Sequence, residues 1–203
     1  MGLQPIGKRV VYEGRKVALE LHEFADEGGL RLTKEVCRHP GAVIVLAFLD
    51  AETILLVRNR RWPIGGQWLL ELPAGTLEPP EPPIACAARE LEEEAGYRAG
   101  RIEPLAGFYT APGLLGELMH AFVATDLTHV GVRHEPGEEI EVVTLAYAEA
   151  LRMIDAGELT DGKSIAALLM YDRRPPRGTA SPGASPRAEE KPWGSDWELG
   201  VRS

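Results

Sequence analysis

Four carboxylates crowd into five positions near the middle of the chain. Residues 88–96 read ARELEEEAG and place Glu90, Glu92, Glu93 and Glu94 together. On a helix, like charges one turn apart repel by about 0.2–0.5 kcal/mol per pair, and negative charge late in a helix also opposes the helix dipole. A divalent cation bound between the carboxylates would offset both penalties. Because the set lacks His and Cys, its hard oxygen ligands favour Mg²⁺, with Mn²⁺ as a substitute.

The helix that would carry these carboxylates has its boundaries written into the sequence. Pro82 and Pro83 fit a helix start, where a missing N–H costs little, and Gly96 fits the left-handed position just past the end. The apolar residues that recur between them at helical spacing are Ile84, Ala87, Ala88, Leu91 and Ala95. At about 100° per residue, three of the four carboxylates fall beside this stripe, and Glu92 is expected to point to water. The alternative interpretation is a solvated acidic helix face.

Strands dominate the remainder of the folded chain. The β-rich runs lie at 9–14, 16–24, 41–50, 53–59, 67–75, 105–112, 117–127 and 139–147, and two helices are expected at 148–157 and 164–173. This pattern predicts an α+β domain whose sheet is sandwiched between helices. We interpret 1–40 as N-terminal strands of this unit, 41–172 as its core, and 173–203, rich in Pro, Ser and Arg, as a disordered tail.

The composition narrows the class of protein. The chain has 203 residues, a hydrophobic fraction of 44% and a net charge of −9, which predicts a globular protein without broad binding to nucleic acid or anionic membrane. The N-terminus lacks the apolar core of a signal peptide, and the longest apolar run, 42–49, is too short to span a bilayer. Cys37 and Cys86 have no metal-binding spacing, so free thiols in the cytoplasm are expected.

The carboxylate cluster belongs to a longer pattern. From Gly75 the chain reads Gly, five residues, Glu81, seven residues, Arg-Glu-Leu, one residue, Glu-Glu, one residue, Gly-Tyr. This pattern resembles the Nudix box, GX5EX7REUXEEXGU, where U is a bulky aliphatic residue. Only Tyr97, an aromatic residue at the final U, departs from it. The resemblance implies the Nudix α/β/α sandwich over roughly residues 8–172, with a mixed β-sheet and an N-terminal β-strand extension.

The resemblance also implies a site. The implied metal ligands are the Ala74 carbonyl, Glu90, Glu93, Glu94 and Glu138. The implied structural positions of the box are Gly75, Glu81, Arg89 and Gly96. Arg89 would hold the carboxylates through salt bridges, and Glu93 would bind or orient a second metal or its water. In the loop 131–139, Glu138 is the first choice for the catalytic base and Glu135 the second.

Three further segments, 35–43, 58–75 and 107–122, resemble ADP-ribose pyrophosphatases. The substrate-binding residues that this implies are Arg38, Arg61, Trp62, Pro112 and Gly113. For the two arginines the alternative is an ordinary surface position, and for Trp62 it is core packing. The implied reaction is Mg²⁺-dependent hydrolysis of the diphosphate bond in a nucleoside diphosphate sugar, with ADP-ribose yielding AMP and ribose 5-phosphate.

One departure leaves the base of the substrate open. Close relatives place aromatic side chains for adenine near the first strands, where this chain has Arg15, Lys16 and Lys34. GDP-mannose and FAD are therefore alternative substrates, and oxidised nucleoside triphosphates are a third. A regulatory Nudix-like domain that binds a ligand without catalysis is the alternative from another class, although the complete box argues against it. The resemblance further implies a homodimer in which N-terminal strands pair or swap.

Overall fold

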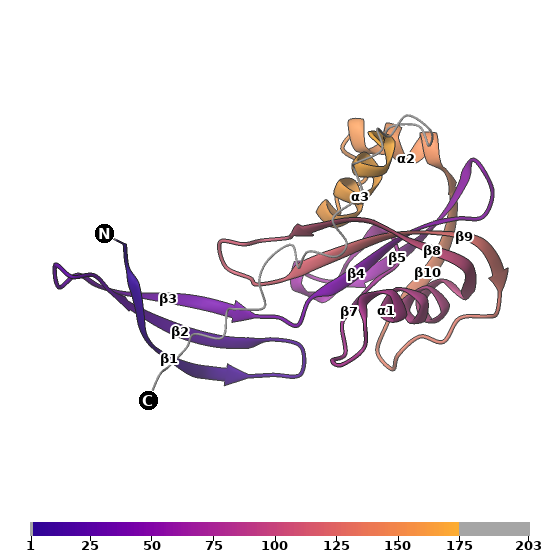
Figure 1. Ribbon diagram of the computed structural model, residues 1–203. Helices are drawn as coiled ribbons and strands as arrows, with labels where there is room; N and C mark the ends of the chain where they lie inside the picture. Colours follow the sequence, from indigo (N-terminus) through magenta and orange to yellow (C-terminus); the bar gives the residue numbers. More distant parts are fainter. Residues whose placement is uncertain (1, 175–203) are drawn as a thin grey trace.

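A computed structural model describes residues 2–174, so all but the first two residues of the predicted tail lie outside it. Figure 1 shows a small N-terminal sheet that projects from a larger body. Its strands β1 (Gln4–Glu13), β2 (Ala18–Ala25) and β3 (Arg31–Arg38) pair antiparallel in that order. Two glycine-containing turns, at 14–17 and 26–30, join them.

The main sheet is mixed, and its strand order is β10-β5-β4-β9-β8. These strands are β4 (Ala42–Phe48), β5 (Thr53–Arg61), β8 (Tyr97–Tyr109), β9 (Leu118–His129) and β10 (Ile140–Ala146). A short helical turn, η1 (Trp62–Ile64), leads to β6 (Gln67–Glu71), which pairs with β5, and then to β7 (Ala74–Thr76), which pairs with β4. The central strands β4 and β9 run parallel, and the other ladders of this sheet within the described chain are antiparallel.

Helices cover both faces of this sheet. Because successive side chains of a strand point to opposite faces, β4 contributes to two separate cores. Val43 and Val45 pack with α1 (Pro83–Glu90), whereas Ile44 and Leu46 pack with α2 (Tyr147–Asp155) and α3 (Gly162–Asp172). The predicted sandwich is therefore confirmed. Within residues 2–174, no helix combines the length and the apolar character that crossing a membrane requires.

Two local features differ from the sequence prediction. The central helix is not one regular helix, since α1 gives way to a π-helical stretch, η2 (Leu91–Ala95), which carries three of the four carboxylates. Gly96 then has φ of +76°, and a β-carbon there would lie 2.9 Å from the backbone of Gly131. The following strand begins at Tyr97, earlier than the predicted 105, because pairing with the far end of β9 extends it.

Candidate active site

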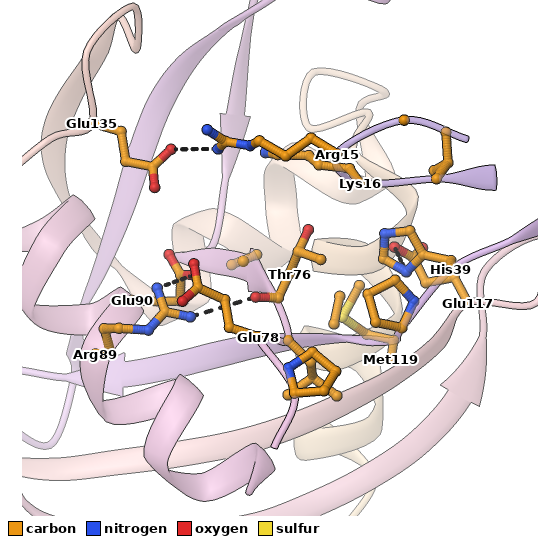
Figure 2. A pocket seen from close by; sticks show the side chains of 18 of the residues that line it. Arg15, Lys16, His39, Thr76, Glu78, Arg89, Glu90, Glu117, Met119 and Glu135 are labelled. Atoms are coloured by element: carbon orange, nitrogen blue, oxygen red, sulfur yellow. Dashed lines mark hydrogen bonds and ion pairs between the residues drawn. The ribbon is translucent and has the colours of Figure 1, made fainter. Parts of the chain in front are cut away.

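A cleft of about 1010 Å³ lies between the N-terminal sheet and the part of the main body that carries the Nudix-box helix, α1 with η2. Its lining comes from the β1–β2 turn, the end of β3, β7 and the loop after it, α1 with η2, the loop 131–139, and the start of α3. Figure 2 shows side chains from several of these elements around the cavity. Segments that lie far apart in the sequence thus border one cavity.

One side of this cleft is formed by Glu90, Glu93 and Glu94, which we call the acidic floor. Glu94 is only 5% exposed, and its Oε2 accepts a hydrogen bond of 2.9 Å from the N–H of Ala74. Burial raises the pKa of Glu94 to about 8, although the bond from Ala74 opposes this. Burial also raises the pKa of Glu90, against the effect of Arg89. The floor is therefore costly to ionise without a compensating cation.

Arg89 and Gly75 shape the acidic floor. Arg89 Nη1 donates to Glu90 Oε1 at 2.7 Å and to Glu93 Oε2 at 3.0 Å, and Nη2 donates to Glu81 Oε1 at 2.8 Å. The hydrogen bonds from Arg89 lower the pKa of Glu81 to about 2. A β-carbon on Gly75 would lie 1.9 Å from the carboxyl carbon of Glu90. Only glycine at this position leaves the Glu90 carboxylate where it lies.

Glu92 was predicted to point to water, but in the structure it binds two arginines. Its carboxylate accepts hydrogen bonds from Arg98 Nε at 2.7 Å and from Arg133 Nη2 at 3.1 Å. The bond from Arg98 lowers the pKa of Glu92. The chain reverses after Gly96, which brings Arg98 back beside η2, and the segment after β9 brings Arg133 to the same place. Glu92 does not line the cleft.

The donor set of the floor fits a hard divalent cation. Three carboxylates line the cleft together with Ala74, whose N–H bonds Glu94, and carboxylate and carbonyl oxygens suit Mg²⁺ or Mn²⁺. In residues 2–174, no three His, Cys, Asp or Glu side chains are placed as a complete metal cage, and Arg89 bridges Glu90 and Glu93 instead.

The loop 131–139 brings both candidate bases to the cleft. Glu138 and Glu135 line it, and Glu138 Oε2 accepts a hydrogen bond of 2.9 Å from the N–H of Glu135. The charge of Glu138 contributes to the raised pKa values of Glu90 and Glu94, after the larger effect of burial. His134 Nε2 lies 3.1 Å from the carbonyl oxygen of Glu94 and so ties the loop to the end of the box.

Two of the five predicted substrate-binding residues line the cleft. Arg61 forms two hydrogen bonds to Glu71, at 2.7 and 2.6 Å, and Arg38 contacts Glu20 and Glu13. The residues predicted to bind substrate that lie outside the cleft lining are Trp62, Pro112 and Gly113. Trp62 does not pack in the core either, because it is 61% exposed and stacks against the guanidinium of Arg60 at 4.5 Å.

A buried polar cluster beside the cleft was not predicted from the sequence. Glu71 is 1% exposed and holds both Arg61 and Lys163, and Lys163 also binds Asp161. Burial alone would raise the pKa of Glu71, but these two cations hold it below its usual value. Ser164 Oγ accepts from the N–H of Leu72 at 2.8 Å, so α3 is tied to the segment that precedes the box. The sequence did contain a signal for this buried ion pair, because Glu71 lies inside the otherwise apolar run WLLELP.

Comparisons with known proteins agree with this architecture. The family model of the NUDIX domain matches residues 38–168. The chain is 34% identical over 165 residues to an ADP-ribose pyrophosphatase of Bacillus subtilis (strain 168), covering 80% of this chain and 89% of that protein. It is 37% identical over 155 residues to a GDP-mannose pyrophosphatase of Salmonella paratyphi B, covering 68% and 80%. A crystal structure of an ADP compounds hydrolase shares the fold, with a TM-score of 0.73 and 20% identity over 85% of this chain and 93% of that one.

The chain belongs to the Nudix family. Within that family it is a pyrophosphatase, a hydrolase that acts on phosphorus-containing anhydrides. The resemblance drawn from the box and from the segments around it is thereby confirmed.

Proposed function

We propose that this chain hydrolyses the diphosphate bond of a nucleoside diphosphate sugar, with ADP-ribose as the substrate and AMP and ribose 5-phosphate as the products. The observation that carries the proposal is the acidic floor, in which Arg89 bridges Glu90 and Glu93 and the N–H of Ala74 holds Glu94. It forms one side of a cleft whose lining also includes Arg38 and Arg61. The resemblance to an ADP-ribose pyrophosphatase over most of both chains supports the choice of substrate.

In this proposal the acidic floor binds Mg²⁺, with Mn²⁺ as a substitute. The ligands would be Glu90, Glu93, Glu94, the carbonyl of Ala74, and Glu138. The cation, when bound, neutralises the diphosphate and lowers the pKa of a bound water. The fit rests on the chemistry of the donors and on Glu94, because burial raises the pKa of its carboxyl group and a nearby positive charge would favour the ionised form.

The remaining residues bind the substrate and move one proton. One water molecule adds to a phosphorus atom, the bridging P–O bond breaks, and two phosphate monoesters form. Glu138 accepts the proton that the water loses, and Glu135 is the second candidate because it lies on the same loop. Arg61 and Arg38 bind the phosphates or the terminal ribose. Their present partners, Glu71, Glu13 and Glu20, hold both guanidinium groups at the cleft.

GDP-mannose is the second candidate substrate, and FAD the third. Among the described residues, no Phe, Tyr or Trp side chain lines the cleft, so the aromatic stacking that would favour adenine is not provided by these three residue types. The 37% identity to a GDP-mannose pyrophosphatase supports the same alternative.

The test is product analysis with a matched pair of variants. Purified protein with Mg²⁺ is incubated with ADP-ribose, GDP-mannose, FAD and nucleoside triphosphates. We expect AMP from ADP-ribose, and a loss of turnover of at least about 100-fold in Glu93→Gln. Glu92→Gln is the control, since Glu92 binds Arg98 and Arg133 away from the cleft. Preference for GDP-mannose or FAD would change the substrate, and pyrophosphate release from triphosphates would contradict the reaction class.

We also propose a cytoplasmic homodimer that forms through the N-terminal sheet. Strand β1 is an edge strand that is exposed along its whole length and carries exposed Ile6, Val10 and Tyr12. Such an edge favours pairing with another strand. Cys37 and Cys86 are free thiols, which suits a reducing compartment. Light scattering during gel filtration tests the dimer, and a monomeric mass at micromolar concentration would contradict it.

A further inference from the structure

The cleft contains one basic side chain whose charge is not compensated. Six basic residues line it: Arg15, Lys16, Arg38, Arg61, Arg89 and Lys163. Five of them each bind at least one carboxylate. Within residues 2–174, Lys16 is the exception, with no carboxylate at ion-pair distance and no hydrogen bond from its side chain. Its ammonium group is therefore free to meet an anion that enters the cleft.

The turn between β1 and β2 places Lys16 over the cavity. The N–H of Gly14 donates to the carbonyl of Val17 at 2.9 Å, which closes a four-residue turn with Arg15 and Lys16 at its tip. A β-carbon on Gly14 would lie 2.8 Å from the ring of Tyr12, so the turn is tight. We call this turn, residues 14–17, the basic roof. In Figure 2 the side chains of Arg15 and Lys16 extend from it on the side of the pocket opposite Glu90 and Arg89.

Two neighbours fix the surroundings of Lys16. Arg15 Nη2 donates to Glu135 Oε2 at 2.9 Å, so the tip of the roof contacts the loop 131–139. The second neighbour, His39, lines the cleft as well. Burial lowers the pKa of His39, the Glu117 carboxylate opposes this, and the charge of Lys16 adds to the lowering. Arg15 and Arg38, the other cations near this end of the cleft, both have carboxylate partners.

We propose that Lys16 binds the phosphate groups of the substrate from the side opposite the acidic floor, and that Arg15 positions Lys16 by holding the roof against the loop 131–139. This inference rests on the proposed function and names a residue of the same site. A diphosphate carries negative charge on both faces, and the floor addresses one of them. Lys16 comes from the N-terminal sheet, outside the box, and supplies positive charge to the other.

Equilibrium binding tests the role of Lys16. The probe is a non-hydrolysable α,β-methylene analogue of ADP-ribose, titrated calorimetrically into full-length protein with Mg²⁺. Lys16→Met should weaken its binding by about tenfold or more, because a charge-assisted hydrogen bond is lost. Lys16→Arg should restore most of the affinity, and the difference should shrink at high salt. Arg101→Met is the control, since Arg101 is exposed on β8 and does not line the cleft.

Kinetics separate this inference from the proposed function. Lys16→Met should raise KM for ADP-ribose by about the same factor and change kcat by less than about twofold. Turnover in the wild type with unchanged affinity and KM in Lys16→Met would overturn the inference and leave the proposed function standing. Binding of the analogue that depends on Lys16, without turnover of any substrate, would support the inference and contradict the proposed function. If the wild type does not bind the analogue, both fail.

A double-mutant cycle tests the positioning role of Arg15. If Arg15 acts through Lys16, Arg15→Gln weakens binding of the analogue in the wild-type background but has little further effect in Lys16→Met. Arg15→Lys should recover part of the loss, because it can still reach Glu135. Fully additive losses would overturn the positioning role, since they would mean that Arg15 contacts the substrate independently or stabilises the protein generally.

Discussion

The two sides of the cleft are built by different means. The acidic floor lies on α1 and η2, whose apolar residues Ala87, Leu91 and Ala95 are fully buried against the main sheet. The basic roof is a turn of the N-terminal sheet and contacts the loop 131–139 through Arg15 and Glu135, whose side chains are 75% and 47% exposed. Exposed pairs of this kind contribute about 0–1 kcal/mol, so the roof is held far more weakly than the floor.

This difference matches what each side has to do. Carboxylates that repel one another keep their arrangement only on a rigid support, and Glu94 in particular is held by the backbone of Ala74. The roof faces whichever phosphate compound enters, so a weakly held turn can adjust to it. Three predictions sharpen or break this comparison, ordered by their expected effect on the free energy of unfolding.

The largest effect is expected from Glu71, the buried anchor beneath the floor. Glu71→Ala leaves Arg61 and Lys163 without their shared carboxylate, and loss of one partner of a buried pair costs about 3–5 kcal/mol. Because Arg61 is 38% exposed and Lys163 keeps Asp161, the loss should lie near the lower end of that range. The matched change on the roof, Arg15→Gln, should cost less than about 1 kcal/mol. Urea unfolding of both variants measures the contrast. Equal losses would mean that roof and floor are held equally firmly.

The floor was largely predictable from the sequence, because its residues are close together in the chain. Glu90, Glu93 and Glu94 share one helical segment, and Gly96 ends it. The spacing of the box therefore identified the floor, and hydrophobic runs identified most strands and the late helices. Local patterns did not predict the π-helical geometry of η2. This geometry places the carboxylates at different angles around the helix axis from those of a regular α-helix.

The roof and the buried anchor were not predictable, because non-local packing creates them. Lys16 lies 74 residues before Glu90 in the sequence, and only the position of the N-terminal sheet brings both to one cleft. Glu71 and Lys163 are 92 residues apart. Glu92 was predicted wrongly for the same reason, because its partner Arg133 lies in a loop 41 residues away.

The second prediction concerns the pH dependence of stability in metal-free protein. The pKa of Glu94 is raised from its ordinary value of 4.5 to about 8 in the folded state. Between pH 4.5 and about pH 8, the folded state therefore binds a proton at Glu94 that the unfolded state has lost. Stability therefore falls as pH rises through this window, and the raised pKa of Glu90 acts in the same direction. Relative to Glu94→Gln, the wild type should lose on the order of 2 kcal/mol between about pH 5 and pH 8.

The comparison with Glu94→Gln removes other titrating groups. Burial lowers the pKa of His39 and of His120, and both would make stability fall as pH drops below about 6.5. These contributions are the same in the two proteins and cancel. Saturating Mg²⁺ should stabilise the wild type more at high pH than at low pH, because it binds the ionised carboxylates. A difference between the two proteins that does not change with pH would contradict the burial of an ionisable Glu94.

The smallest effect on stability is expected from Gly75→Ala, which should nevertheless disable the floor. The new β-carbon would lie 1.9 Å from the carboxyl carbon of Glu90, which is the end of a flexible side chain, so Glu90 moves and the backbone stays. The free energy of unfolding should change by less than about 1 kcal/mol. Turnover should fall by about 100-fold, because Glu90, a proposed metal ligand, is displaced. The control is Gly162→Ala, where no atom lies within 4 Å of the new β-carbon. A large loss of stability would show that Gly75 supports the fold as well as the floor. Wild-type turnover would show that the position of Glu90 is not required, and would remove one of the three carboxylates from the proposed site.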